Sequence, residues 1–414
     1  MIWINISNIL KVDKFSGIAR TEYELCLYAY KLSQQGCNIK FSTFDDCTGF
    51  IEITSLQLSE VLHNLKNDCV IKNNRLKFIP KFSRSILKRL NTFRVFCGVV
   101  SHCFQDGDLI ISVGQNLGSN EMKAFEIIKS KIKIELKLLC HDLIPIKYPE
   151  FFLNKNTSLF SKYMNQTIKV VDHFYCNSKF TRNELSEYHT KMGVSQPPMT
   201  VVTLGCDLYM KKITDNESEL LRSLINQPYL LFVSTIEIRK NHNLIYQMYL
   251  KLLEQGAQNL PPVYFVGRRG WKVEALLNNL DNDSRIKDKI RILDNVSDSD
   301  LIQLYKHCWF TLYPSFIEGY GLPVAESLSF GKFCLSSNAG SLTEVGRKYI
   351  DYADPHQLDQ WAEKFLFLIN HPEYVAEKEK QIRDQYRPTS WEECSKEILN
   401  SELLTSKQDQ LSTV

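Results

Sequence analysis

The chain has 414 residues, of which 50 are basic and 47 acidic, and its formal net charge at pH 7 is +3. This length suffices for two or three domains with their own cores, and 44% hydrophobic and 23% charged residues are ordinary for a folded protein. No apolar run of 18 residues and no basic-flanked apolar leader is present, so we expect neither a membrane-spanning helix nor a signal peptide. The 12 cysteines include no Cys-x-x-Cys pair, which indicates reduced core thiols in the cytoplasm.

The histidines and acidic residues give no sign of a metal site. The nine histidines show no metal-ligand spacing. Two Asp-x-Asp pairs, Asp281 with Asp283 and Asp298 with Asp300, sit in polar sequence and are interpreted as solvated loop carboxylates. We therefore expect no metal ion and no cofactor.

Short apolar strands alternate with amphipathic helices along the chain, which predicts an α/β fold with parallel, doubly wound sheets. In the first half, strands are expected at 2–6, 38–44, 108–112, 135–140, 173–176 and 200–203, and helices near 17–34, 120–130, 157–170 and 179–190. In the second half, strands are expected at 229–233, 263–266, 290–293, 310–313 and 333–336, and helices near 241–255, 271–279, 298–307, 323–330 and 357–370. Two Rossmann-like domains are the simplest architecture.

The domain boundaries follow from the breaks in this alternation of strands and helices. The strand series of the first half ends at 203–207, and the polar stretch 211–219 precedes the next series. We predict a first domain at 1–207, a second at 208–385, and a last segment at 386–414 that contains an amphipathic helix. This helix would pack back on the first domain, and the polar tail after it would fray.

The loop after the first strand contains Ser16 and Gly17 at the start of a helix. Amides there would face a phosphate or a sugar, or Ser16 would simply cap the helix in a tight turn. The three-glycine dinucleotide pattern Gly-x-Gly-x-x-Gly is absent, which argues against a Rossmann dehydrogenase.

The segment 72–94 is strongly basic. It contains eight Lys or Arg residues and no acidic one, and Phe82, Ile86, Leu90 and Phe93 recur at helical spacing between the charges. A basic amphipathic helix fits an anionic membrane surface, and the alternative is a solvated helix face over ordinary core contacts. Motifs typical of nucleic-acid binding are absent, so we expect no nucleic-acid partner.

Polar residues also follow three other predicted strands. His141 and Asp142 come after the strand at 135–140, where His141 could hydrogen-bond a sugar hydroxyl or a reacting carbonyl. The alternative is a structural histidine beside an aspartate that caps a turn. Arg239 and Lys240 follow the strand at 229–233, and Arg268 follows the strand at 263–266. Cations next to a helix N-terminus oppose its dipole, so an anion is their natural partner.

The most informative stretch is 315–327, Ser-Phe-Ile-Glu-Gly-Tyr-Gly-Leu-Pro-Val-Ala-Glu-Ser. Glu318 is expected at the rim of the sheet, where ligands of α/β proteins bind. The glycines Gly319 and Gly321 allow close approach of backbone to a ligand, and Pro323 is typical of the first position of a helix.

The helix that follows this turn is predicted to bind part of a nucleotide. Its N–H groups at Leu322, Val324 and Ala325 would be free to bind an anion. Glu326, in the first turn, would accept two hydrogen bonds from a vicinal diol such as ribose. Sugar, diphosphate and ribose are the parts of a nucleotide sugar, although first-turn glutamates also favour any helix dipole.

These residues resemble a known family. Glu318 and Glu326 form the Glu-x7-Glu motif of retaining glycosyltransferase family 4, whose GT-B fold places two Rossmann-like domains across a cleft, with a C-terminal crossover helix. The stretches 233–241, 263–271, 313–326 and 336–345 resemble family motifs in order. Ser16-Gly17-Ile18 and the stretch 141–145 resemble a mannosyltransferase-like bacterial branch that builds surface polysaccharides.

The resemblance implies roles for single residues. Glu318 would bind donor-sugar hydroxyls, and Glu326 the nucleotide ribose. Lys240 with Arg239 would neutralise the departing diphosphate, and His141 would contact the transferred sugar near its reacting carbon. Further donor contacts are implied at Gly17, Arg268, Tyr320, Gly321 and Leu322. Many family members carry an arginine where this chain has Thr235, and Arg239 or Arg268 would take its place.

The implied activity is metal-independent, retaining transfer of a hexose from a nucleotide sugar, guessed as GDP-mannose, with UDP-hexoses and dTDP-rhamnose as other donors. The acceptor would be a glycan or lipid-linked glycan bound by the first domain, in the synthesis of O-antigen, capsule or exopolysaccharide. The enzyme would be cytoplasmic, with 72–94 as the segment that would bind the inner membrane. The alternatives are a GT-B sugar-nucleotide epimerase and a non-catalytic membrane-binding module.

Overall fold

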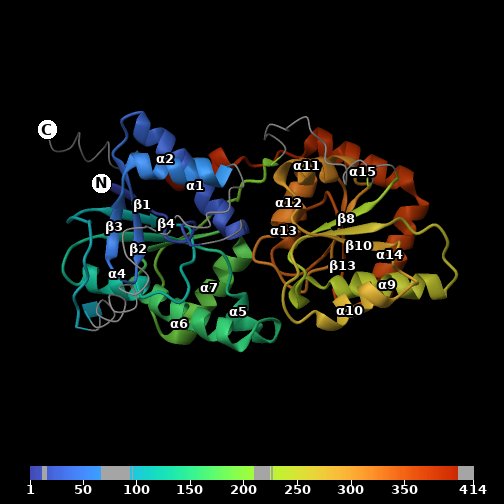
Figure 1. Ribbon diagram of the computed structural model, residues 1–414, viewed down its shortest axis with the longest axis horizontal. Coiled ribbons are helices and arrows are strands. Elements are labelled where there is room, and N and C mark those ends of the chain that lie inside the picture. Colours follow the sequence, from blue (N-terminus) through green and yellow to red (C-terminus); the bar gives the residue numbers. More distant parts are fainter. Residues whose placement is uncertain (12–15, 67–93, 96, 209–223, 225–226, 400–414) are drawn as a thin grey trace. The chain divides into compact units, whose positions relative to one another are not determined.

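The structure is a computed structural model that describes residues 1–11, 16–66, 94–95, 97–208, 224 and 227–399. The chain forms two compact units (Figure 1). Unit 1 contains Met1–Ile146, Asn154–Gly205 and the chain from Ser390 onward. Unit 2 contains Lys147–Leu153 and Cys206–Thr389. Apart from Arg94, the basic segment 72–94 lies outside the described residues.

Unit 1 is built on a seven-stranded sheet with the order β3-β2-β1-β4-β5-β6-β7. All neighbours pair in parallel except β2 with β3, which are antiparallel. Apolar runs such as Ile-Trp-Ile in β1 are buried on both faces, as in a sheet covered by helices. The strands are β1 (Ile2–Asn5), β2 (Ile39–Asp45), β3 (Gly49–Ile53), β4 (Leu109–Ser112), β5 (Glu135–Cys140), β6 (His173–Cys176) and β7 (Met199–Val201).

Capping residues mark the ends of two helices of unit 1. Ser16 and Ser178 accept hydrogen bonds from Ala19 N and Thr181 N and so cap α1 and α7, and α7 ends at Gly193 with φ +64°. The helices are α1 (Gly17–Gln34), α2 (Ser55–Lys66), α4 (Glu121–Lys129), α5 (Ile144–Lys147), α6 (Asn154–Val170) and α7 (Lys179–Met192).

Unit 2 has a six-stranded, fully parallel sheet with the order β10-β9-β8-β11-β12-β13. Figure 1 shows α11 and α15 on one side of this sheet and α9 and α10 on the other. The strands are β8 (Leu230–Val233), β9 (Val263–Val266), β10 (Ile290–Leu293), β11 (Thr311–Tyr313), β12 (Cys334–Ser337) and β13 (Asp351–Ala353). The helices are α9 (His242–Glu254), α10 (Glu274–Asn282), α11 (Asp298–His307), α12 (Leu322–Ser329), α13 (Leu342–Gly346), α14 (Leu358–Asn370) and α15 (Pro372–Gln385).

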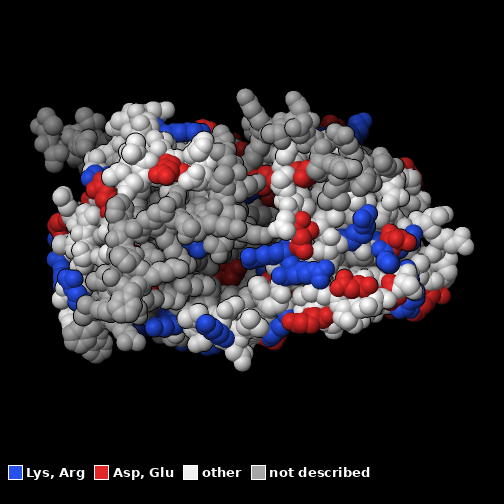
Figure 2. Space-filling model, viewed as in Figure 1, with Lys and Arg blue, Asp and Glu red and all other residues white. Residues whose placement is uncertain are grey.

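The prediction of an α/β fold with two doubly wound, Rossmann-like sheets is confirmed. Within the described residues, no helix is long and apolar enough to cross a membrane. On the face shown in Figure 2, acidic and basic side chains of unit 2 are interspersed rather than gathered by sign.

One segment belongs to a different unit from the one in which the sequence placed it. Residues 147–153, predicted within the first domain, are part of unit 2. Trp271 Nε1 donates to Phe151 O at 2.8 Å, and Lys272 Nζ donates to Glu150 O at 2.6 Å. The Phe151 ring also stacks on Phe316, with centroids 5.4 Å apart. These contacts, made by residues distant in sequence, attach the segment to unit 2.

The end of the described chain lies in unit 1. Residues 391–399 form a helix in which Trp391, Ile398 and Leu399 are buried. Tyr175 donates its hydroxyl hydrogen to Ile398 O at 3.2 Å. A Cβ at Gly205 would lie 2.5 Å from Trp391 Cα, so the backbone at 205 passes too close to this helix for any side chain.

Candidate functional site

A cluster of buried charges lies beyond the carboxyl ends of β8 and β11 in unit 2. Glu318 accepts a hydrogen bond from Lys240 Nζ at 2.6 Å, and its other oxygen pairs with Arg239 Nη1 at 2.9 Å. The side chains of Glu318, Arg239 and Lys240 are only 8%, 14% and 12% exposed. The structure therefore brings together three of the side chains that the sequence singled out.

A short 3₁₀ turn after β8 sets the direction of the two cations. It spans Ile238–Lys240 and ends at Asn241, whose left-handed backbone (φ +59°) leads into α9. The Asn241 side chain donates to Pro314 O and Pro355 O, and Phe316 N donates to Arg239 O. The loop that carries Arg239 is therefore fastened to the loop that carries Glu318.

The charge state of the cluster follows from its pairing. Burial alone would raise the pKa of Glu318, but Arg239 and Lys240 outweigh it and hold this pKa at about 2. Burial lowers the pKa of Lys240, as does Arg239, while Glu318 and Glu237 oppose the shift. Glu318 is consequently a carboxylate at neutral pH, an acceptor of hydrogen bonds and not a proton donor.

Two further residues complete the cluster, and the sequence analysis did not select them. Glu237, itself buried, pairs with Arg239 Nη2 at 2.8 Å, so Arg239 lies between two carboxylates. The Tyr313 hydroxyl lies 2.9 Å from Lys240 Nζ and donates to Glu318 at 3.2 Å. Two features of the sequence could have identified them. Glu237 lies two residues before Arg239, and Tyr313 is the last residue of a predicted strand.

The backbone around Glu318 is held by a second loop. Ser341 donates to Glu318 O through its backbone N–H (3.1 Å) and its hydroxyl (3.0 Å), and the hydroxyl also lies 2.8 Å from Tyr320 O. Gly340 has φ +62°, and a Cβ there would lie 2.3 Å from Glu318 O. Only glycine therefore fits the position that brings Ser341 against this turn.

The start of α12 differs in detail from the prediction. Leu322 is its first residue and Pro323 its second, after Gly321 with φ +102°. The N–H groups of Val324 and Ala325, expected to be free, both donate to Gly321 O, because the first turn closes on this carbonyl. Within the described residues, the Leu322 N–H has no hydrogen-bond acceptor.

Glu326 lies in the second turn of α12, not the first, because the helix begins at Leu322. Its Oε2 accepts a hydrogen bond from the Tyr305 hydroxyl of α11 at 3.0 Å. Gly321, Leu322 and Glu326 thus belong to one helix and its cap, which follows directly on the turn that carries Glu318 and Tyr320.

The loops after β8 and β9 run side by side. Ile236 N donates to Arg268 O, Gly270 N donates to Ile236 O, and Ile236 forms a parallel bridge with Arg269. The Arg268 side chain is exposed. Its backbone therefore lies beside the loop that contains Thr235, while its charge remains in solvent.

The two Asp-x-Asp pairs are not loop carboxylates, because both are largely helical. Asp298 and Asp300 lie in the first turn of α11, where Ser297 caps the helix, and Asp281 lies in α10. Asp283, directly after α10, pairs with Arg285 at 2.7 Å. In the part of the chain that the structure describes, no group of three or more His, Cys, Asp or Glu side chains has a metal-binding arrangement.

The remaining candidates, Gly17 and His141, belong to unit 1. Gly17 is the exposed first residue of α1. His141 follows β5, is buried, and its Nε2 lies 2.7 Å from Val113 O. Burial lowers the pKa of His141 to about 4, so the ring is neutral at pH 7 and Nε2 carries the hydrogen that Val113 O accepts.

The same edge of the unit 1 sheet contains two buried carboxyl groups. Glu121 accepts a hydrogen bond from Asn5 Nδ2 at 3.0 Å, and Glu22 accepts one from Asn8 N at 3.2 Å. Burial raises the pKa of both, that of Glu22 to about 8. A Cβ at Gly114 would lie 2.6 Å from Glu22 Oε2, so the loop after β4 passes close to this carboxyl.

The part of unit 2 that contains the charged cluster is similar to a known family. The model for "Glycosyl transferases group 1" matches residues 215–387, which include the charged cluster and α12. Residues 215–387 form a glycosyltransferase group 1 domain. The resemblance stated from the Glu-x7-Glu motif is thereby confirmed.

Two curated proteins similar to this chain come from Escherichia coli. The O-antigen chain mannosyltransferase B is 27% identical over 266 residues, which cover 63% of this chain and 68% of that protein. The serotype-specific mannosyltransferase WbdA is 27% identical over 197 residues, 45% of this chain and 24% of that protein. The chain thus spans about a quarter of the length of WbdA.

A solved structure of similar fold covers this chain almost completely. The crystal structure of Anabaena Alr3699/HepE in complex with UDP and glucose has a TM-score of 0.62 and 16% identity. The match covers 98% of this chain and 99% of that one. At this identity the likeness concerns the fold, and it confirms the GT-B prediction.

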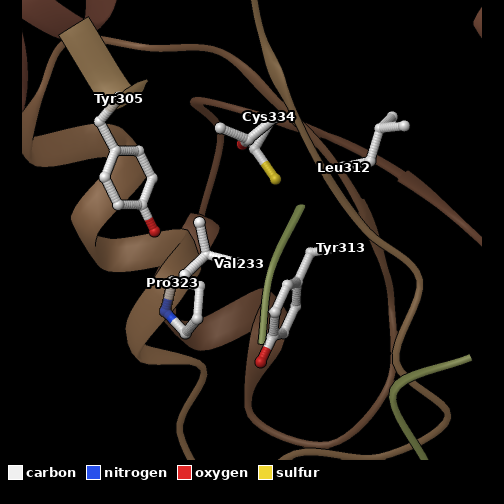
Figure 3. Close-up of a pocket in the computed structure, with 7 residues that line it drawn as sticks. Val233, Tyr305, Leu312, Tyr313, Pro323 and Cys334 are labelled. Atoms are coloured by element: carbon white, nitrogen blue, oxygen red, sulfur yellow. The ribbon is translucent and has the colours of Figure 1, made fainter. Parts of the chain in front are cut away.

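A small pocket of unit 2 lies between β8, β11 and the start of α12 (Figure 3). Val233, Tyr305, Tyr313 and Pro323 are among its lining residues, but it has no room for a water molecule. Figure 3 shows the Tyr305 hydroxyl directed toward the start of α12. This pocket is a packing gap behind the charged cluster, so we assign no ligand to it.

Proposed function

We propose that the glycosyltransferase transfers a hexose from a nucleoside diphosphate sugar to a glycan acceptor, with retention of configuration and without a metal ion. The observation that carries the proposal is the buried Lys240–Glu318 pair at the carboxyl edge of the unit 2 sheet, within the matched domain. The Glu-x7-Glu spacing to Glu326 supports a donor that binds along this edge.

We propose mannose as the transferred sugar and GDP-mannose as the donor. The support is that both curated relatives named above are mannosyltransferases. The HepE structure was solved with UDP and glucose, so a UDP-hexose is the donor to test beside it. The name of the O-antigen chain mannosyltransferase B supports an acceptor from O-antigen synthesis, and a lipid-linked glycan is the form of it that we propose.

The proposed reaction breaks the bond between the anomeric carbon and the oxygen of the β-phosphate. The nucleoside diphosphate leaves with the electron pair, and an acceptor hydroxyl forms the new bond on the same face. The proton of that hydroxyl passes to the departing phosphate oxygen. Lys240 would stabilise the charge that develops on the leaving group. Glu318, a carboxylate with a pKa of about 2, would accept hydrogen bonds from sugar hydroxyls and not act as the acid.

The pairing in the cluster favours separate tasks for the cations. Arg239 lies between Glu237 and Glu318, so we assign it chiefly to holding Glu318 in place. Arg268 is exposed beside the loop of Thr235, which suits it to the first phosphate contact. Amides at Gly321 and Leu322, with Tyr320 beside them, would complete the donor contacts. The roles of Gly17 and His141 remain predictions for unit 1.

The first test combines nucleotide binding with transfer. Glu318→Gln and Lys240→Met should each lower the transfer rate by about a hundredfold or more, because each removes a preorganised partner of the transition state. The matched control is Lys251→Met, which breaks a surface pair with Asp359 outside the cluster and should leave the rate unchanged. Full activity of either cluster variant would overturn the assignment.

Binding and reaction class are tested with the unmodified protein. GDP or UDP should raise the melting temperature by mass action. Stabilisation by none of GDP, UDP and dTDP would count against a nucleotide-sugar enzyme. An isomer formed from the nucleotide sugar alone, without acceptor, would indicate an epimerase instead.

We also propose that the enzyme acts in the cytoplasm, at the inner face of the membrane, with 72–94 as the binding segment. The support is the charge and apolar spacing of that segment alone. Co-sedimentation with anionic but not neutral vesicles is the expected result, and equal binding to both would contradict it.

A further inference from the structure

A tyrosine of α11 holds one of the two motif glutamates. The Tyr305 hydroxyl donates to Glu326 Oε2 at 3.0 Å. The Tyr305 side chain is buried, and its ring stacks on Phe330 just after α12, with centroids 5.0 Å apart and planes 7° from parallel. The stack fixes the ring relative to α12, so the hydroxyl meets the carboxylate from a defined direction.

The hydroxyl remains a donor throughout the working pH range. Burial raises the pKa of Tyr305 well above its usual value, and the charge of Glu326 raises it further. Tyr305 is only 1% exposed, and its hydroxyl is directed toward the start of α12 (Figure 3). Any effect of Tyr305 on a ligand therefore passes through Glu326.

Glu326 needs such a partner because its side chain has three rotatable bonds and is only partly buried. A carboxylate that accepts from two adjacent hydroxyls must keep both oxygens in one plane facing the diol. A fixed donor on Oε2 removes much of the rotational freedom that binding would otherwise have to remove.

We propose that Tyr305 is a positioning residue that orients the Glu326 carboxylate for the vicinal 2′,3′-diol of a ribonucleotide donor. The inference rests on the proposed function, in which Glu326 binds the ribose. It adds a consequence for donor choice, because a thymidine diphosphate sugar lacks the 2′-hydroxyl. The site thus favours GDP or UDP donors over dTDP donors.

The test compares Tyr305→Phe with the unmodified protein, using GDP, 2′-deoxy-GDP and 2′,3′-dideoxy-GDP in calorimetric titrations. If UDP stabilises the protein better than GDP, the uridine series replaces the guanosine series. The unmodified protein should bind the ribonucleotide about tenfold more tightly than the dideoxynucleotide. Tyr305→Phe should weaken ribonucleotide binding roughly threefold to tenfold and leave dideoxynucleotide binding unchanged. In transfer assays, KM for the donor should rise with little change in kcat.

The control is Tyr249→Phe, which removes another buried hydroxyl, one that donates to Pro261 O at 2.6 Å. It should lower stability without changing the ribose preference. In a Glu326→Gln background, Tyr305→Phe should have no further effect on ribose preference, because the carboxylate that it orients is absent.

The outcomes separate the inference from the function on which it rests. If Tyr305→Phe weakens both ligands equally, or neither, the positioning role is wrong. If the unmodified protein does not discriminate between ribose and dideoxyribose and Glu326→Gln changes nothing, the ribose role of Glu326 is wrong. If no nucleoside diphosphate binds, the proposed function itself fails.

Discussion

At the scale of single residues, two buried carboxyl groups, one in each unit, have pKa values shifted in opposite directions. Glu318 is paired with two cations, and its pKa is held at about 2. Glu22 in α1 has a backbone N–H as its hydrogen-bond donor, and burial raises its pKa to about 8. One site thus keeps a carboxylate charged, and the other favours a neutral acid at pH 7.

The raised pKa of Glu22 predicts a pH-dependent stability. An acid whose folded pKa (about 8) exceeds its unfolded value (4.5) binds its proton more tightly in the folded state. Its contribution to stability is fully present below pH 4.5 and is lost as the pH rises to 8. Glu22→Gln should therefore be more stable than the unmodified protein at pH 8, by on the order of 3 kcal/mol.

Chemical denaturation between pH 4.5 and 8 measures this difference. The gap between Glu22→Gln and the unmodified protein should widen as the pH rises. Glu60→Gln, on the exposed face of α2, should show a constant gap near zero. A gap that does not depend on pH would mean that Glu22 is ionised in the folded state.

At the scale of elements, the loop before α13 shapes the turn that carries Glu318. Gly340→Ala should lower the transfer rate, because its Cβ would collide with Glu318 O and displace that turn. Gly340→Ala should also lower stability for two reasons, because alanine is strained at this positive φ and because its Cβ collides with Glu318 O. Gly193 is the matched control, since its φ of +64° is close to the +62° of Gly340 and its Cβ would meet nothing within 4 Å.

Gly193→Ala should lower the free energy of unfolding by about 1 kcal/mol, because alanine is strained in the left-handed region. Gly340→Ala should cost clearly more in equilibrium unfolding, and only Gly340→Ala should lower the transfer rate. Equal stability losses with an unchanged rate in both variants would show that the Glu318 turn does not depend on Gly340.

The elements that were predictable are those with a local signal. Apolar runs at β5 and β9 and the spacing in α9 and α14 identified their positions to within a few residues. The antiparallel strand β3 and the short helix α13 were missed, because their placement depends on neighbours in the sheet and on the turn at Glu318. The Tyr305–Glu326 and Glu237–Arg239 contacts were missed because no pattern in the chain marks which side chains face each other after folding.

At the scale of the whole molecule, the C-terminal helix matters for unit 1. Trp391→Ala should destabilise unit 1 by about 3–5 kcal/mol, because it empties a buried site packed against Gly205. Hydrogen exchange should show faster exchange in β6, whose Tyr175 donates to this helix, and little change in β9 of unit 2. Leu56→Ala, on an exposed site, is the control. Equal loss of protection in both units would contradict the assignment of this helix to unit 1.

The chain passes from one unit to the other after Ile146, Leu153, Gly205 and Thr389. A recombination event with a single crossover near 206 would therefore separate Phe151 from Phe316 and Tyr175 from Ile398. A functional chimaera with a related enzyme must exchange 147–153 together with 206–389 and leave the terminal helix with its own first half. The way the chain passes between the units thus limits which segments can be exchanged with both units kept intact.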